Sequence, residues 1–461
     1  MSLLSAFIVP HPPLIVPAVG KGEEQKINKT IEAYEAVARR IEQMRPETIV
    51  LISPHSILYA DYIHISPGAG AEGDLSQFRA PAERCTVKYD QTLAAAIALI
   101  AGREGISAGG LGEKIRRLDH GTMVPLHFVN QRYHDYELVR ISVSGLSPLD
   151  HYRFGKCLAE AIQNSKKRVV LIASGDLSHK LTSDGPYGFA TEGPEFDKAI
   201  TEAMASADFG RFLAFDDDFC EAAGECGLRS FTIMAGALDG VTVKSELLSY
   251  EGPFGVGYAV AAFEPIGEDA ARRFDVAYER AQGDILAAQK THEDPYVKLA
   301  RQTLEQYVLH RRRIARPTGL SADLTDRAAG VFVSLKRDGR LRGCIGTIAA
   351  TTDCVADEII QNAVSAGARD PRFDPVGADE LSRLVYSVDV LGEAEPVASI
   401  AELDPKRYGV IVRKGRKSGL LLPNLEGVDR VEDQLSIALQ KGGIDPDDTY
   451  TMERFEVVRH H

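Results

Sequence analysis

The first 265 residues alternate short apolar runs with amphipathic segments. Apolar runs near residues 5–10 and 48–53 indicate buried strands, and a charged segment near 23–45 between them has helical spacing. This β-α-β order predicts a parallel, right-handed crossover. The same patterns predict further helices near 91–102, 149–164 and 195–206, and further strands near 137–144, 168–173 and 255–263. We therefore expect an α/β domain over residues 1–265, with a mixed or parallel sheet flanked by helices.

The pattern changes after residue 265. Residues 266–293 are rich in Ala, Glu, Asp, Arg and Gln and predict a linker helix. A second domain is expected over 294–461, because Asp294 and Pro295 are a typical N-cap and first residue of a helix. Apolar runs joined across Asp338-Gly339 predict a hairpin. The predicted elements of this α+β domain are helices near 295–309 and 353–367, the hairpin 331–335 with 341–346, and strands near 384–391, 409–413, 418–422 and 450–458.

Length, charge and cysteine usage limit the class of protein. A chain of 461 residues exceeds one ordinary hydrophobic core and fits two domains. The net charge of -13 argues against a nucleic-acid partner, because binding to phosphates depends on clustered Lys and Arg. No apolar stretch reaches the roughly 18 to 20 residues of a membrane span, and the start lacks the basic segment of a signal peptide. The six cysteines include no Cys-x-x-Cys pair, which fits a reducing compartment. From these features together we expect a cytoplasmic location without membrane association. The oligomeric state is not indicated.

Histidines follow the predicted strands of the first domain. His11 ends the first apolar run, His55 follows the second, and His179 trails the run near 168–173. His120 lies in Leu118-Asp119-His120-Gly121. In open α/β sheets, ligands bind outside the carboxyl ends of the strands, where imidazoles can bind a metal or transfer protons. We expect His11 and His55, at the ends of neighbouring strands, to converge on one metal ion.

The third metal ligand must come from later in the chain. Two imidazoles and one carboxylate with open positions suit ferrous iron and oxygen chemistry, and zinc accepts similar ligands. The candidates are Glu225, Cys226 and Glu251. Side chains of adjacent residues rarely point the same way, so only one of Glu225 and Cys226 is expected to bind.

Four segments of the first domain resemble the class III extradiol ring-cleavage dioxygenases, the LigB-like superfamily, whose fold the Memo family shares. They are Val9-Pro10-His11-Pro12-Pro13, Ser53-Pro54-His55, Leu118-Asp119-His120-Gly121 with Val124-Pro125-Leu126, and Ser174-Gly175-Asp176-Leu177-Ser178-His179. The resemblance covers roughly residues 1–265.

This resemblance implies roles for the histidines. It implies a ferrous site with His11 and His55 as ligands, His179 as general acid/base, and His120 as a residue that helps bind substrate and oxygen. The dioxygenases use a glutamate as third ligand, which points to Glu225, whereas Memo-type proteins carry a cysteine in a Cys-Gly context, which points to Cys226. On the sequence we favour Glu225, with Cys226 as the alternative.

The second domain resembles the AMMECR domain family, which has no established biochemical activity. The segments that carry the resemblance are Gly330 to Leu335, Leu341-Arg342-Gly343-Cys344-Ile345-Gly346, Ala368 to Phe373 and Gly419 to Pro423. Cys344 is expected to be a packed thiol, the alternative being a reactive thiol activated by Arg342. Arg369-Asp370-Pro371-Arg372 fits either an anion-binding loop or an ion pair.

These observations lead to two hypotheses for the function. The first is a metal-dependent, ferrous, dioxygenase-like oxidoreductase that acts on an aromatic or catecholic small molecule, with zinc or another divalent metal as the alternative to Fe(II). The second is a Memo-like binding or redox module without ring cleavage. Fusions of the two modules resemble a prokaryotic system that also contains a radical SAM protein, which implies such a protein as a partner.

Overall fold

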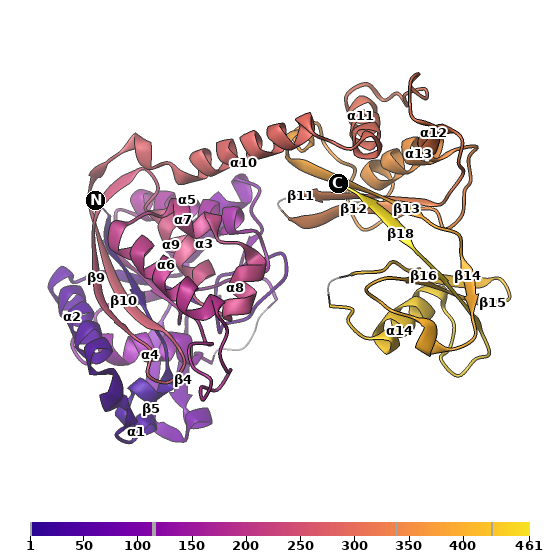
Figure 1. Cartoon of the computed structure of the whole chain (residues 1–461). Coiled ribbons are helices and arrows are strands. Elements are labelled where there is room, and N and C mark those ends of the chain that lie inside the picture. Colours follow the sequence, from indigo (N-terminus) through magenta and orange to yellow (C-terminus); the bar gives the residue numbers. More distant parts are fainter. Residues whose placement is uncertain (1, 113–116, 338, 426) are drawn as a thin grey trace. The chain divides into compact units, whose positions relative to one another are not determined.

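The chain forms two compact units. A computed structural model describes residues 2–112, 117–337, 339–425 and 427–461 (Figure 1). The first unit is Met1–Glu279 and the second is Arg280–His461. The chain passes from one to the other within helix α10 (Phe274–Thr291), which occupies most of the predicted linker. Among the described residues, no helix has the length and apolar character needed to cross a membrane.

A six-stranded sheet with the order β7-β2-β8-β1-β10-β9 organises the first unit (Figure 1). Its strands are β1 (Leu3–Val9), β2 (Thr48–Ser53), β7 (Glu137–Ser142), β8 (Val169–Ser174), β9 (Val241–Glu251) and β10 (Tyr258–Glu268). β7, β2, β8 and β1 are parallel, whereas β10 and β9 add antiparallel pairs, which confirms the predicted mixed α/β fold. One expectation was wrong: β1 and β2 are not neighbours, because β8 lies between them. Apolar pattern alone does not encode strand order.

Both faces of this sheet are buried under helices. Successive residues of β1 point to opposite faces, so Ala6 and Ile8 join one hydrophobic core and Phe7 and Val9 the other. Each fully buried side chain the size of Phe7 stabilises the fold by about 1.5–3 kcal/mol. The longer helices that contribute to the first core are α3 (Gln91–Arg103), α5 (Pro148–Ser165), α6 (Glu192–Ser206) and α9 (Leu228–Ala237), and those that contribute to the second are α2 (Asn28–Met44) and α4 (His120–Val129). Runs without alternation therefore identified strands that are covered on both faces.

Shorter elements connect these layers. They are η1 (Pro13–Ile15), α1 (Pro17–Gly20), η2 (Glu23–Ile27), β3 (Ile63–His64), β4 (Gly70–Leu75), η3 (Ser76–Phe78), β5 (Ala80–Lys88), β6 (Ala108–Gly109), α7 (Gly210–Ala214), α8 (Asp217–Ala223) and η4 (Ala270–Arg272). The helix expected over 23–45 thus begins as a 3-10 turn and becomes α-helical at Asn28.

The second unit contains two four-stranded sheets, with the orders β12-β11-β13-β18 and β14-β17-β15-β16. Its strands are β11 (Val331–Arg337), β12 (Arg340–Gly346), β13 (Leu384–Leu391), β14 (Glu395–Val397), β15 (Gly409–Lys414), β16 (Lys417–Leu421), β17 (Thr451–Phe455) and β18 (Val457–His460). Its helices are α11 (Pro295–His310), α12 (Ala322–Thr325), η5 (Leu381–Arg383), α13 (Val355–Ala368), η6 (Ile400–Glu402) and α14 (Val431–Gly442). α13 packs on the sheet β12-β11-β13-β18, and α14 packs on the sheet β14-β17-β15-β16, in agreement with the predicted α+β class.

Two predictions for the second unit need comment. The strand expected near 450–458 is two strands, β17 and β18, which break at Glu456 because they belong to different sheets. β11 and β12 pair as the predicted hairpin, and Gly339 has a φ of +77°, which favours glycine. Asp338 lies outside the described residues.

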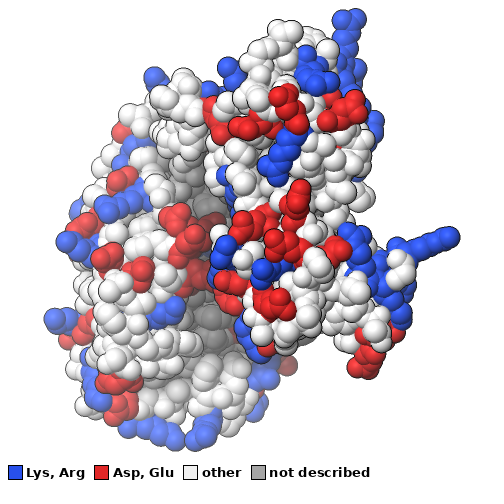
Figure 2. All heavy atoms as spheres, turned by 45° about the vertical axis from the view of Figure 1, so that its right-hand side comes forward, with Lys and Arg blue, Asp and Glu red and all other residues white. Residues whose placement is uncertain are grey.

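On the face shown in Figure 2, basic side chains stand among acidic ones.

Candidate metal centre

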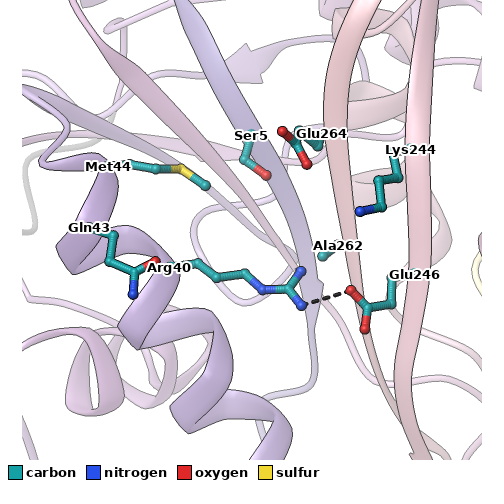
Figure 3. A pocket seen from close by; sticks show the side chains of 8 residues that line it. All are labelled: Ser5, Arg40, Gln43, Met44, Lys244, Glu246, Ala262 and Glu264. Atoms are coloured by element: carbon teal, nitrogen blue, oxygen red, sulfur yellow. Dashed lines mark hydrogen bonds and ion pairs between the residues drawn. The ribbon is translucent and has the colours of Figure 1, made fainter.

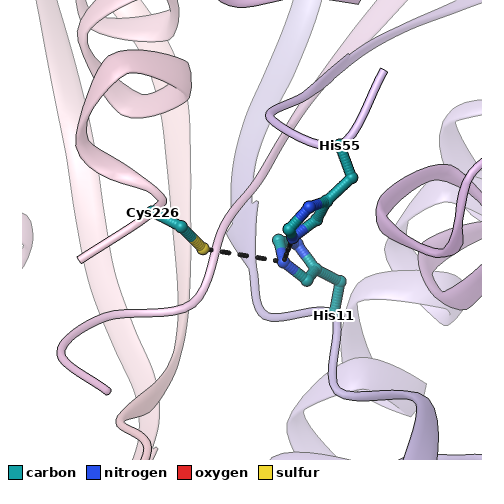
Figure 4. Close-up of side chains that lie close together, drawn as sticks. All are labelled: His11, His55 and Cys226. Atoms are coloured by element: carbon teal, nitrogen blue, oxygen red, sulfur yellow. Dashed lines mark hydrogen bonds between the residues drawn. The ribbon is translucent and has the colours of Figure 1, made fainter. Parts of the chain in front are cut away.

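Three side chains from distant parts of the chain converge at the carboxyl ends of the parallel strands in the six-stranded sheet. His11 follows β1, His55 follows β2, and Cys226 precedes α9. His11 Nε2 lies 2.9 Å from His55 Nε2 and 3.7 Å from Cys226 Sγ, and the three ligand atoms all lie within 4.8 Å of one another (Figure 4). His11 is buried, Cys226 half-buried and His55 exposed, so the site is accessible from the His55 side.

The three ligand atoms fit one transition-metal ion. Metal–nitrogen and metal–sulfur bonds of about 2.0 and 2.3 Å in a tetrahedron place ligand atoms roughly 3.3–3.6 Å apart. The distances of 2.9 and 3.7 Å from His11 Nε2 lie close to that range. Two imidazoles and a thiolate are donors that zinc, iron and copper accept.

Neighbouring side chains hold the two histidines in place. The His11 backbone N–H donates to Asp176 Oδ1 at 2.7 Å, and the His11 ring Nδ1 lies 2.9 Å from Ser174 Oγ. The His55 backbone N–H donates to Ser53 Oγ at 3.2 Å, and that hydroxyl donates to Asp119 Oδ1 at 2.5 Å. Asp119 therefore connects the His55 segment to α4, which it also caps by accepting from the Thr122 N–H.

The structure brings His120 and His179 to the same place. His120 is the first residue of α4, and its ring centroid lies 4.1 Å from that of His55 and 5.4 Å from that of His11. Burial and, after it, the charge of His55 lower the pKa of His120 and that of His179 to about 4. Desolvation likewise lowers the pKa of the buried His11 and, although one side of the His55 ring is exposed, that of His55. All four rings are therefore neutral at pH 7, the form in which imidazole binds metals or accepts a proton.

The other candidate ligands point elsewhere. Glu225 Oε2 accepts a hydrogen bond from the Leu228 N–H at 2.7 Å, at the start of α9. Glu251 Oε2 accepts from the N–H and hydroxyl of Thr30, both at 2.8 Å. Of the three candidates, only Cys226 is brought to His11 and His55 in the described part of the chain.

Asp176 is a site residue that the sequence analysis did not single out. Its Oδ2 lies 4.0 Å from His11 Nε2, its backbone oxygen lies 3.7 Å from Cys226 Sγ, and burial raises its pKa to about 7. Burial also raises the pKa of the Cys226 thiol well above its usual range. The signal was present, because Asp176 lies between Ser174 and His179 in a segment that carried the family resemblance.

Aromatic rings flank the two further histidines. Tyr187 stacks on His179 with ring centroids 5.1 Å apart, although 62% of Tyr187 is exposed. Phe78 meets His120 edge to face at 5.4 Å. The low aromatic content of the chain gave no indication of these rings, since a binding surface needs only a few of them.

A separate pocket of about 350 Å³ lies away from these histidines. It is lined by Ser5, Arg40, Gln43, Met44, Lys244, Glu246, Ala262 and Glu264 (Figure 3). Arg40 of α2 and Glu246 of β9 form an ion pair at 2.7 Å across it. Its lining includes neither a histidine nor a cysteine.

In the second unit, Cys344 lies on strand β12, which pairs with β11. Cys344 Sγ accepts a hydrogen bond from the Ser334 hydroxyl at 3.2 Å on the neighbouring strand. Arg342 forms a bidentate pair with Glu380, at 2.6 and 2.7 Å, and so is engaged away from the thiol. Arg372 and Asp370 form the ion pair that was one of the two alternatives, at 2.7 Å. Asp370 Oδ2 also accepts from the Cys344 N–H at 2.9 Å.

Comparison with known proteins agrees with this architecture. Residues 5–261 match the family described as catalytic LigB subunit of aromatic ring-opening dioxygenase, and residues 297–460 match AMMECR1. The Clostridium acetobutylicum protein CA_C1420 is 45% identical over 468 residues, which cover 100% of this chain and 99% of that protein. A Thermotoga maritima protein is 51% identical over 170 residues, 36% of this chain and 98% of its own length.

One solved structure adds to these relatives. The uncharacterized protein PH0010 from Pyrococcus horikoshii is 31% identical, with a TM-score of 0.34, and covers 36% of this chain and 88% of its own.

The fold and the histidine cluster define an α/β protein with a potential metal centre. The chain belongs to the LigB family, a family of metal-dependent dioxygenases, and carries an AMMECR1 domain after it. A LigB domain implies a small-molecule substrate.

Proposed function

We propose that the first unit is a metal-dependent oxidoreductase that binds one transition-metal ion through His11, His55 and Cys226 and acts on a small aromatic molecule. The observation that carries the proposal is the convergence of three ligand atoms beside two further neutral imidazoles. Iron(II) is the first candidate for the metal because of the dioxygenase family, with zinc or another divalent metal as the alternative.

The surrounding residues support a role for each further histidine. A bound metal would supply a Lewis-acid centre for a phenolic oxygen and for oxygen. His179 is neutral and half-buried, so its free ring nitrogen can accept a proton from a substrate hydroxyl. His120 faces the same space as His55 and can orient the substrate. Tyr187 and Phe78 offer ring faces and edges against which an aromatic substrate can pack.

The cysteine favours a second candidate function. A glutamate would complete the two-histidine, one-carboxylate set of non-haem iron oxygenases, whereas a thiolate is a softer ligand typical of redox-active or zinc sites. The position of Cys226 beside His11 thus supports a Memo-like redox or binding module as the alternative. In that case a radical SAM protein, implied by the sequence resemblance, is the proposed partner.

Metal analysis tests the proposal. Protein purified without oxygen should contain one metal ion per chain, and His11→Ala, His55→Ala and Cys226→Ala should each lose it. Glu225→Gln is the matched control, because the amide keeps an acceptor for the Leu228 N–H, and it should retain the metal. Metal-free wild-type protein, or unchanged metal content in the three alanine variants, would refute the site.

Oxygen consumption with a panel of catechols then separates the two functions. Ring cleavage by metal-loaded protein supports the dioxygenase. A metal-loaded protein that consumes no oxygen with any catechol supports the redox or binding module.

A further inference from the structure

Three serines form a row at the carboxyl end of the first sheet. Ser53 of β2 is paired in register with Ser142 of β7, and Ser174 of β8 pairs with Val9 of β1. Ile52 pairs with Ala173, so Ser53 and Ser174 are next to each other in the same register. All three are buried, and alternation places them on the face covered by α4.

Ser174 differs from the other two because its hydrogen-bond directions are fixed. Its Oγ lies 2.6 Å from the backbone oxygen of Gly121, which can only accept. The single hydroxyl hydrogen of Ser174 is therefore used in that bond. The Oγ atom can then only accept through its lone pairs, and it lies 2.9 Å from His11 Nδ1. For this contact to be a hydrogen bond, His11 Nδ1 must carry the hydrogen and donate it.

We infer that Ser174 is a positioning residue that holds His11 in the Nδ1–H tautomer and thereby directs the lone pair of Nε2 at the metal. The inference rests on the proposed metal site. The opposite tautomer would place a hydrogen on His11 Nε2. That hydrogen would lie between His11 and the other two ligand atoms, His55 Nε2 at 2.9 Å and Cys226 Sγ at 3.7 Å, where it would block the ion. Metal-binding histidines commonly donate their other ring N–H to a fixed acceptor.

Asp176, which also contacts His11, does not accept a hydrogen bond from its Nδ1. Asp176 Oδ1 is engaged by the backbone N–H of His11 at 2.7 Å. Asp176 Oδ2 lies 4.0 Å from Nε2, which is too far for a hydrogen bond.

Gly121 permits the close approach on which the contact depends. A Cβ at this position would lie 2.5 Å from Ser53 Oγ and 3.5 Å from His11 Nδ1. A larger residue would therefore push α4 away from the serine row, and with it the carbonyl that receives the Ser174 hydrogen. The dipeptide His120-Gly121 thus supplies both a site histidine and the anchor for Ser174.

The tautomer can be measured without a metal. In histidine labelled with ¹⁵N, the two ring nitrogens of a neutral imidazole resonate in separate ranges according to which one carries the hydrogen. With the His11 signal assigned by its loss in His11→Ala, metal-free wild-type protein at neutral pH should show hydrogen on Nδ1. Hydrogen on Nε2 would overturn the inference, and this spectrum decides it even if Ser174→Ala does not fold.

Zinc affinity provides the second arm, by competition of Zn²⁺ alone with a coloured chelator. Ser174→Ala should bind Zn²⁺ roughly 10- to 100-fold more weakly than wild type. Ser142→Ala is the matched control: it removes a serine of the same row whose Oγ accepts from the His64 N–H at 3.0 Å, and it should bind as wild type does. Equal affinity of the two variants would overturn the inference. Failure of wild-type protein to bind any metal would instead refute the proposed function and leave the tautomer measurement standing.

Discussion

The Nε2 atoms of His11 and His55 lie 2.9 Å apart, although the strands that precede the two residues are not neighbours. β8 separates β1 from β2, and its last residue, Ser174, contacts the far side of the His11 ring. The two histidines therefore meet above the end of the intervening strand. Such a meeting point outside the carboxyl ends of parallel strands is where open α/β sheets bind ligands.

The identity of the third ligand can be read from a spectrum. Cobalt(II) bound to a thiolate gives an intense near-ultraviolet charge-transfer band that carboxylate ligands do not give. Cobalt-loaded wild-type protein and Glu225→Gln should both show the band, and Cys226→Ser should lose it, because the thiol of Cys226 lies beside His11 Nε2, whereas the Glu225 carboxylate binds the Leu228 N–H. A band that persists in Cys226→Ser would rule out this cysteine as a ligand.

Loss of the Asp119 carboxylate should affect both stability and metal binding. Asp119→Ala removes the cap of α4 and the acceptor of the Ser53 hydroxyl, so we expect a loss of about 1–2 kcal/mol in the free energy of unfolding, measured in urea. Metal affinity should fall as well, because Ser53 Oγ also binds the His55 backbone.

Asp216→Ala is the control for this effect. Asp216 caps α8 by accepting from the Phe219 N–H at 3.1 Å, away from the histidines. This variant should lose stability but keep its metal affinity. If the two variants bind metal equally well, Asp119 has no role beyond capping.

The ion pair of Asp370 and Arg372 should make the second unit sensitive to acid. The hydrogen bond from Arg372 lowers the pKa of Asp370 from 3.8 to about 2. Because the folded pKa is below the unfolded one, the stabilisation is complete above about pH 4 and is lost as the pH falls towards about 2. Asp370→Asn should remove about 1–2 kcal/mol at neutral pH and flatten the pH dependence in that window.

Urea unfolding followed between about pH 2 and 5 measures this dependence. Asp353→Asn, at an exposed position with no described ion pair, should keep the slope of the wild-type protein. An unchanged slope in Asp370→Asn would contradict the prediction.

Tyr187 should contribute to binding of an aromatic substrate. Its ring lies against His179 and is largely exposed, so a substrate ring can stack on it. Tyr187→Ala should raise KM up to about tenfold, with a smaller change in kcat, since a ring contact is worth about 0.5–1.5 kcal/mol. Tyr187→Phe keeps the ring and should behave as wild type, and Phe189→Ala, a nearby exposed ring, serves as control. A fall in kcat alone would point to a catalytic role.

The sequence by itself determined the fold class and the approximate position of most elements. The parallel strands are covered on both faces, so they appear as continuous apolar runs, and the intervening helices have a clear amphipathic period. The histidines at the strand ends were equally visible, because the carboxyl ends of strands in open α/β sheets are where ligands bind. The segment around Asp176 carried the family resemblance, although the role of its carboxyl group was not evident.

Only the tertiary structure decided which atoms meet. Glu225 and Cys226 are adjacent in the chain, and the sequence favoured Glu225 with Cys226 as the alternative. After the left-handed turn at Gly224, with a φ of +66°, the Glu225 side chain turns to the N–H of Leu228 while Cys226 faces His11. Adjacent side chains point in different directions, and which of them faces a site depends on the path of the backbone through space. Strand order was likewise decided only by the tertiary structure, because β8 lies between β1 and β2 through contacts between segments far apart in the chain.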